Sequence, residues 1–127
     1  MNENELAKEI VDAAYTVYMT LGPGLLESVY EAALSHELTE RGFVVQRQVP
    51  FPVRYGSVEI PEGFRADLVV GAKVIVELKS VEEESPVHKK QLLTYLRMAD
   101  KRLGLLINFG VARFKDGVSR VVNRLPE

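Results

Sequence analysis

The 127-residue sequence predicts an α/β (α+β) fold, on three observations. Apolar residues recur at helical spacing over residues 4–20. The stretch from Phe64 to Ser80 is instead typical of two strands, rich in valine, isoleucine and leucine and joined at Gly71-Ala72. The continuous apolar run at residues 103–108 is typical of a strand that is buried on both faces.

Three helices are predicted from apolar periodicity and from end signals. The first covers residues 4–20 and ends at Gly22-Pro23-Gly24, because proline cannot continue a helix and glycine accepts turn conformations. The third covers residues 86–100, with Pro86 at an acceptable first-turn position. The second covers residues 25–41, and its predicted buried stripe is Leu26, Val29, Tyr30, Ala33, Leu34 and Leu38.

The remaining segments are predicted to be extended or irregular. Residues 43–55 contain Pro50 and Pro52, which favour an edge strand or a bend. Residues 57–63 are expected to form a short connection to the central hairpin. Residues 110–123 are expected to form a final ribbon or an irregular segment.

Length and composition are those of an ordinary globular protein. The chain is long enough for one domain with a real core, so residues 1–127 are expected to form a single domain. It contains no cysteine, which excludes disulfides and cysteine-ligated zinc or iron–sulfur sites. No segment resembles a signal peptide or a membrane span, so we expect a cytoplasmic location and no membrane partner.

Charge is unevenly distributed along the chain. Residues 1–84 carry 7 Lys or Arg and 15 Asp or Glu, whereas residues 85–127 carry 9 and 3. The basic final third can supply an electrostatic footprint for phosphates, while the acidic part can hold a cation. The alternative is that both sets are solvated surface charges.

Asp67, Glu77 and Lys79 are ionisable groups set into the apolar hairpin. Burial of an unpaired charge is costly, so such groups are normally paired, bound to a cation or shifted in pKa. Two interpretations remain open at this point. The first is a divalent-metal site, and the second is a cross-strand salt bridge between Lys79 and a carboxylate.

The length of the hairpin turn determines which side chains share a face. Side chains alternate along a strand, so a two-residue turn at Gly71-Ala72 would place Asp67 opposite Val76, on the wrong face for a site with Glu77. A three-residue turn from Gly71 to Lys73 would place Asp67 opposite Glu77, and a bulge near Asp67 would also restore the alignment. A shared metal site therefore requires one of these two arrangements.

Several segments together resemble the PD-(D/E)XK nuclease superfamily. The superfamily's pattern is matched by Glu27, then Asp67, then Glu77-Leu78-Lys79, then Gln91 and Tyr95. The segment GLLESVY at residues 24–30 also matches the signature of the GxxExxY family, which is placed within that superfamily. FRADLVV, VIVELKS, PVHKKQLLTYL and RLGLLINFG are similar to the same family, so the resemblance covers nearly the whole chain. It implies a restriction-endonuclease-like core, with a mixed sheet flanked by helices in αβββαβ order and an extra N-terminal helix.

The resemblance also implies a set of metal ligands. Asp67 is implied as the principal metal-binding carboxylate and Glu77 as its partner, with the backbone carbonyl of Leu78 completing the shell. Glu27 matches the helical acid that helps to orient the metal site; otherwise it is a helix N-terminal acid favoured by the helix dipole. Hard oxygen ligands suit Mg²⁺ or Mn²⁺.

The remaining matched residues are implied to act on the substrate. Lys79 would lie beside the attacking water and the scissile phosphate, where it stabilises developing negative charge. Gln91 and Tyr95 are four residues apart, so they project from one face of the third helix and are implied to line the active site. His88 is expected at the surface.

The resemblance implies a Mg²⁺- or Mn²⁺-dependent phosphodiesterase that acts on DNA or RNA. One alternative is a non-catalytic module of the same fold that binds nucleic acid or a protein. The other is a structural protein in which Asp67, Glu77 and Lys79 form only an ion-pair network. A homodimer is expected by analogy with small nucleases that span two strands.

Overall fold

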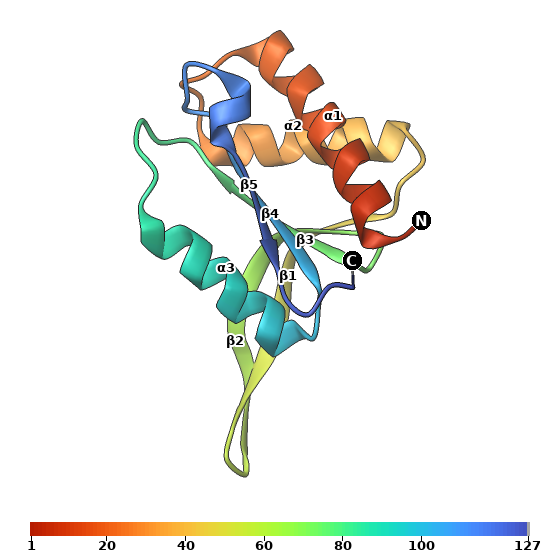
Figure 1. Cartoon of the computed structure of the whole chain (residues 1–127), viewed down its shortest axis with the longest axis vertical. Helices are drawn as coiled ribbons and strands as arrows, with labels where there is room; N and C mark the ends of the chain where they lie inside the picture. The colour runs from red at the N-terminus through yellow and green to blue at the C-terminus, as the bar shows by residue number, and fades with distance from the viewer. Residues whose placement is uncertain (127) are drawn as a thin grey trace.

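The computed structural model describes residues 1–126, and its centre is a five-stranded sheet with helices on both faces (Figure 1). The predicted α+β class with a mixed sheet is confirmed. In chain order the elements are α1 (Glu3–Leu21), α2 (Glu27–Glu40), β1 (Val45–Tyr55), β2 (Val58–Val70), β3 (Val74–Lys79), α3 (Pro86–Ala99), β4 (Leu103–Asn108), the short 3-10 helix η1 (Phe114–Gly117) and β5 (Val118–Val122).

The strands lie side by side in chain order, and only β3 and β4 are parallel. A parallel pair needs a crossover connection, which helix α3 supplies. Because the two strands run in the same direction, their C-terminal ends meet at one edge of the sheet, where Lys79 pairs with Asn108. All six residues of β4 are buried, as the apolar run predicted.

The helices are divided between the two faces of the sheet (Figure 1). Helices α1 and α2 pack on the face that carries Val74 and Val76, whereas α3 packs on the face that carries Ile75. Side chains alternate along β3, so Glu77 and Lys79 follow Ile75 on the α3 face.

Helix ends follow from local side chains. Asn2 and Glu5 form a capping box at the start of α1, in which each side chain accepts a hydrogen bond from the other residue's backbone amide. Ser85 caps α3, and Pro86 occupies its first turn as expected. None of the helices within residues 1–126 has the length and apolarity needed to cross a membrane.

Two sequence-based expectations are wrong. Residues 57–63 are not a connection, because β2 begins at Val58 and pairs with β1 in a ribbon that extends beyond the rest of the sheet (Figure 1). The predicted stripe of α2 is confirmed at Tyr30, Leu34 and Leu38, which are buried, but it is wrong at its start, because the helix begins at Glu27. Leu26 then precedes its first turn, and Leu26 and Val29 are 74% and 39% exposed.

The last segment combines the two alternatives that the sequence left open. Residues 110–113 form turns and bends, η1 follows, and β5 pairs with β4 in an antiparallel ladder. The edge position predicted for the proline-containing segment is confirmed, because β1 is an outer strand of the sheet.

Candidate active site

The turn between β2 and β3 has three residues, Gly71 to Lys73. Val70 pairs with Val74 across it, and the ladder continues to Leu68 and Val76. Extended by one position, this register places Asp67 opposite Glu77. It is the arrangement that a shared site requires.

At this point β2 and β3 stop pairing through backbone groups and are joined by their acidic side chains. The Asp67 amide donates to Oε2 of Glu77 at 2.8 Å. The Leu78 amide donates to Oδ2 of Asp67, also at 2.8 Å. Each carboxylate is therefore oriented by a backbone hydrogen bond through one oxygen, and its second oxygen lies outside that bond.

The two carboxylates repel each other in a poorly hydrated place. Burial, together with the negative charges of Asp67 and Glu27, raises the pKa of Glu77 to about 8. Burial also raises the pKa of Asp67, with a further contribution from the charge of Glu31. Backbone hydrogen bonds and the charge of Lys79 oppose both increases without cancelling them.

Lys79 is half-buried at the end of β3. Within residues 1–126 it forms no ion pair with a carboxylate, although its charge lowers the pKa values of both Asp67 and Glu77. The cross-strand salt bridge considered from the sequence therefore lacks its contact in the described residues. The ammonium group lies near the carboxylates without being bonded to them.

Tyr95 and Gln91 come from α3, which covers this face. Tyr95 stacks on Phe64, with ring centroids 4.1 Å apart. Burial and the charges of Glu77 and Asp67 raise the pKa of the Tyr95 hydroxyl, which therefore lies within electrostatic reach of the pair. Gln91, one turn earlier, is exposed, and His88 is only partly exposed.

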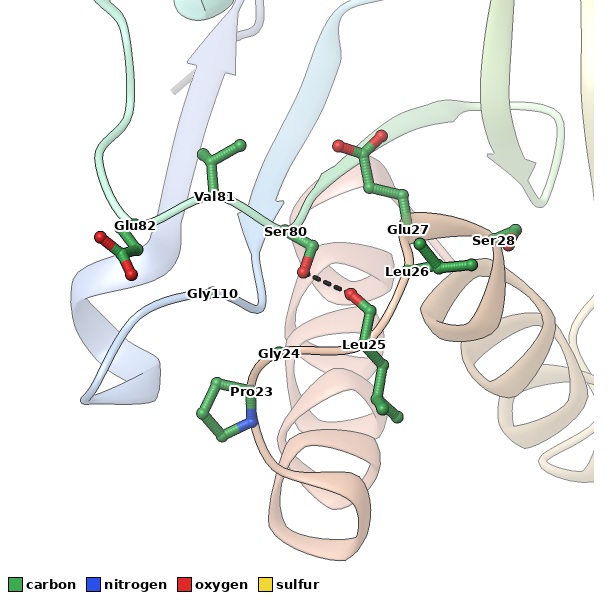
Figure 2. A pocket seen from close by; sticks show the side chains of 10 residues that line it. All are labelled: Pro23, Gly24, Leu25, Leu26, Glu27, Ser28, Ser80, Val81, Glu82 and Gly110. Atoms are coloured by element: carbon green, nitrogen blue, oxygen red, sulfur yellow. Dashed lines mark hydrogen bonds between the residues drawn. The ribbon is translucent and has the colours of Figure 1, made fainter.

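Glu27 lies at the first turn of α2, on the wall of a cleft of about 840 Å³ (Figure 2). It is exposed, and its charge contributes to the raised pKa of Glu77. Even so, no group of three or more His, Cys, Asp or Glu side chains within residues 1–126 is arranged to hold a metal ion. The structure thus brings Asp67 and Glu77 together, whereas Glu27 lines a cleft whose walls do not include this pair.

The cleft wall before α2 is fixed by hydrogen bonds to side chains. The buried Tyr30 hydroxyl donates to the Gly22 carbonyl and accepts from the Leu25 amide. The Ser80 hydroxyl donates to the Leu25 carbonyl at 2.6 Å (Figure 2). Hydrogen bonds therefore hold the segment between α1 and α2 to Tyr30 of α2 and to Ser80, the residue after Lys79.

The segment after β3 is fixed from β4. The buried Asn108 side chain accepts from the Val81 amide and donates to the Val81 carbonyl. The Lys79 carbonyl accepts from the Phe109 amide. Gly110 approaches so closely that a Cβ atom there would lie 2.4 Å from the Val81 oxygen, so a side chain would displace this segment.

The comparisons with known proteins agree with this arrangement. Residues 4–121 match the model of the PD-(D/E)XK nuclease superfamily. The chain belongs to the PD-(D/E)XK nuclease superfamily. A search of curated proteins gives no match. Among solved structures, the crystal structure of SSO0001 superposes with a TM-score of 0.58 at 18% identity, which indicates a shared fold. The alignment covers 96% of this chain but only 60% of SSO0001.

Two residues beside the acidic pair of this PD-(D/E)XK protein were missed from the sequence. Glu31 is 7% exposed, and its carboxylate accepts hydrogen bonds from the side chains of Arg47 and Gln48. Gln48 in turn donates to Asp67 at 3.4 Å. A signal for Glu31 was present, because it lies three residues before Leu34 and so shares the helical face of that buried side chain.

The donor set fits a hard divalent cation, which superfamily members typically use. Asp67 and Glu77 offer carboxylate oxygens from adjacent strands, and burial raises the pKa values of both carboxyl groups. Mg²⁺ commonly binds through one or two carboxylates and keeps several waters. Two positioned carboxylates are therefore a sufficient protein contribution.

Proposed function

We propose that this chain is a Mg²⁺- or Mn²⁺-dependent nuclease that hydrolyses phosphodiester bonds in DNA or RNA. The observation that carries the proposal is the pair Asp67 and Glu77, oriented by backbone amides with the charge of Lys79 nearby. Membership of the superfamily supports it. Within the superfamily we assign the chain to the GxxExxY family, on the segment at residues 24–30.

In this proposal the cation is held by the carboxylates of Asp67 and Glu77, with the Leu78 carbonyl and Glu27 as further ligands. A bound Mg²⁺ or Mn²⁺ would polarise a phosphoryl oxygen and lower the pKa of its water. The two backbone hydrogen bonds orient the acids before the cation arrives, so little ordering is left for binding. The positive charge of the cation would also offset the burial and the repulsion that raise the pKa of Glu77.

Lys79 and α3 act on the nucleic acid. Because the Lys79 ammonium group is not committed to an ion pair within the described residues, it can stabilise negative charge on the reacting phosphate. Tyr95 and Gln91 line the substrate side of the site from α3. The exposed side chains of Lys89 and Lys90 on the same helix supply phosphate contacts.

Cleavage assays test this proposal directly. Purified protein is incubated with single- and double-stranded DNA and RNA, in the presence of Mg²⁺, Mn²⁺ or EDTA. We expect metal-dependent cleavage that Asp67→Asn and Lys79→Ala abolish, with circular dichroism unchanged. Asp116→Asn makes the same chemical change as Asp67→Asn at an exposed position of η1 and should leave cleavage intact. Activity that persists in both site variants would indicate a contaminant or another site.

A second candidate function is a non-catalytic module that binds nucleic acid or a protein. The observation that favours it is that no three-residue metal cluster is formed within residues 1–126. Binding of nucleic acid without cleavage under any metal condition would support this candidate over the nuclease.

We also propose that residues 1–127 form one domain and that the protein acts as a homodimer, since two sites are needed to cut two strands. Light scattering coupled to size-exclusion chromatography tests the dimer. A monomer at the concentrations used for cleavage would exclude it.

A further inference from the structure

Gln48 has an unusual backbone conformation in the interior of β1. Its φ angle is 50°, in the left-handed region that residues other than glycine rarely adopt. On either side the ladder with β2 is regular, because Arg47 pairs with Leu68 and Val49 pairs with Ala66. The position opposite Gln48 is Asp67, and this pair is missing from the ladder.

Such a conformation persists only where surrounding contacts impose it. The side-chain Nε2 atom of Gln48 donates to Oε1 of Glu31 and, over a longer distance of 3.4 Å, to Oδ1 of Asp67. The other oxygen of Glu31, Oε2, accepts from the Arg47 guanidinium at 3.1 Å. Glu31 therefore uses both carboxylate oxygens within the protein, and it anchors the amide rather than offering a free ligand.

The second carboxylate oxygen of Asp67 has a partner on a different strand. Its Oδ2 atom accepts from the Leu78 amide, so the two oxygens have different partners on two neighbouring strands. A carboxylate held at both oxygens cannot rotate freely about its Cβ–Cγ bond. This arrangement coincides with the left-handed backbone at Gln48, an exposed residue of the edge strand β1.

We propose that Gln48 is a positioning residue for Asp67. Anchored by Glu31, its amide fixes the plane of the Asp67 carboxylate together with the Leu78 amide. The consequence for catalysis rests on the proposed function, in which Asp67 holds the cation. The orientation of Asp67 itself does not depend on that function.

The substitutions Gln48→Gly and Gln48→Asn test the proposal. Glycine and asparagine both suit a positive φ angle, so the backbone is kept while the amide is removed or withdrawn. Ala72→Gly is the matched control, because Ala72 has a φ of 59° and lies exposed in the β2–β3 turn. We expect Ala72→Gly to raise the melting temperature or leave it unchanged, whereas Gln48→Gly combines the same backbone relief with the loss of a donor to the buried Glu31 carboxylate.

The two positions should differ in function. Loss of a residue that orients a metal ligand typically costs about 10- to 100-fold in activity or metal affinity. We therefore expect both Gln48 variants to lower kcat and Mn²⁺ affinity by this amount, with KM for the nucleic acid unchanged. Ala72→Gly should leave all three quantities as in the wild type.

A further measurement does not require activity. Hydrogen exchange of the Leu78 amide reports its bond to Asp67, and we expect faster exchange in both Gln48 variants but not in Ala72→Gly. If the wild type neither binds Mn²⁺ nor cleaves, the proposed function fails while this measurement still decides the positioning role. Unchanged exchange at Leu78 in both Gln48 variants would overturn the inference.

Discussion

The substitution Glu77→Gln gives the sharpest test of the site's electrostatics. Glutamine keeps the shape of the side chain and an oxygen that can accept the hydrogen bond from the Asp67 amide, but it does not ionise. It therefore removes the buried negative charge and leaves the rest of the pair in place. The expected effect is a gain in stability that depends on pH.

The magnitude follows from the two pKa values. Glu77 is 7% exposed, and its pKa rises from 4.5 to about 8 on folding. Between these values the folded chain keeps a proton that the unfolded chain has released, so stability falls as pH rises through this window. At about 1.4 kcal/mol for each pKa unit, the total loss by pH 8 is roughly 4 to 5 kcal/mol.

Urea denaturation of both proteins in EDTA, from below pH 5 to above pH 8, measures this difference. Near the low end of this pH range Glu77 is protonated in the folded chain, so the wild type and the Glu77→Gln variant should be similar in stability. Above pH 8 the Glu77→Gln variant should be more stable by several kcal/mol, about the loss just derived. Added Mg²⁺ should stabilise the wild type and have little effect on the variant. Equal stability of the two proteins across the whole range would refute the reasoning.

Three other outcomes are expected. Tyr30→Phe leaves two groups of the preceding loop without their partner and should lower the free energy of unfolding by about 1 to 3 kcal/mol; an unchanged urea midpoint would contradict this. Lys79→Ala should abolish cleavage while Mn²⁺ affinity, measured by calorimetry, stays close to the wild-type value, because Lys79 acts on the substrate. The double substitution Lys89→Ala and Lys90→Ala should reduce the slope of log affinity against log salt for nucleic acid by about 2; a slope equal to that of the wild type would exclude both residues from the interface.

Much of the fold could be predicted because its signals are local. The buried strand at residues 103–108 was evident from a continuous apolar run, and the third helix was evident from Pro86 and its periodicity. The position of Asp67 relative to Glu77 depended on the turn. Alternation along a strand reduced that question to the length of the turn or a bulge near Asp67, and the structure has the three-residue turn.

The parts that were missed depend on contacts between distant residues. Glu31 is buried because Arg47 and Gln48, 16 and 17 residues later, satisfy its carboxylate. No pattern within α2 reveals those partners. Leu26 was expected in the core because its spacing fits the helical stripe, but that spacing has no meaning before the helix begins at Glu27. The strand at residues 58–63 has few apolar side chains pointing inward, so it gave no burial pattern to recognise.

The parallel pairing of β3 with β4 has a consequence for the order in which the protein acquires its properties. Until the chain beyond residue 103 has been synthesised and has docked, β3 has a free edge, and the segment that follows Lys79 lacks the support of Asn108 and Phe109. Glu27, Asp67 and Glu77 are synthesised before β4, but the contacts that support the segment after Lys79 form only after β4 has docked. If the chain is the nuclease proposed above, a nascent or partly unfolded chain would therefore not cleave nucleic acid, because the site would be complete only with the finished sheet.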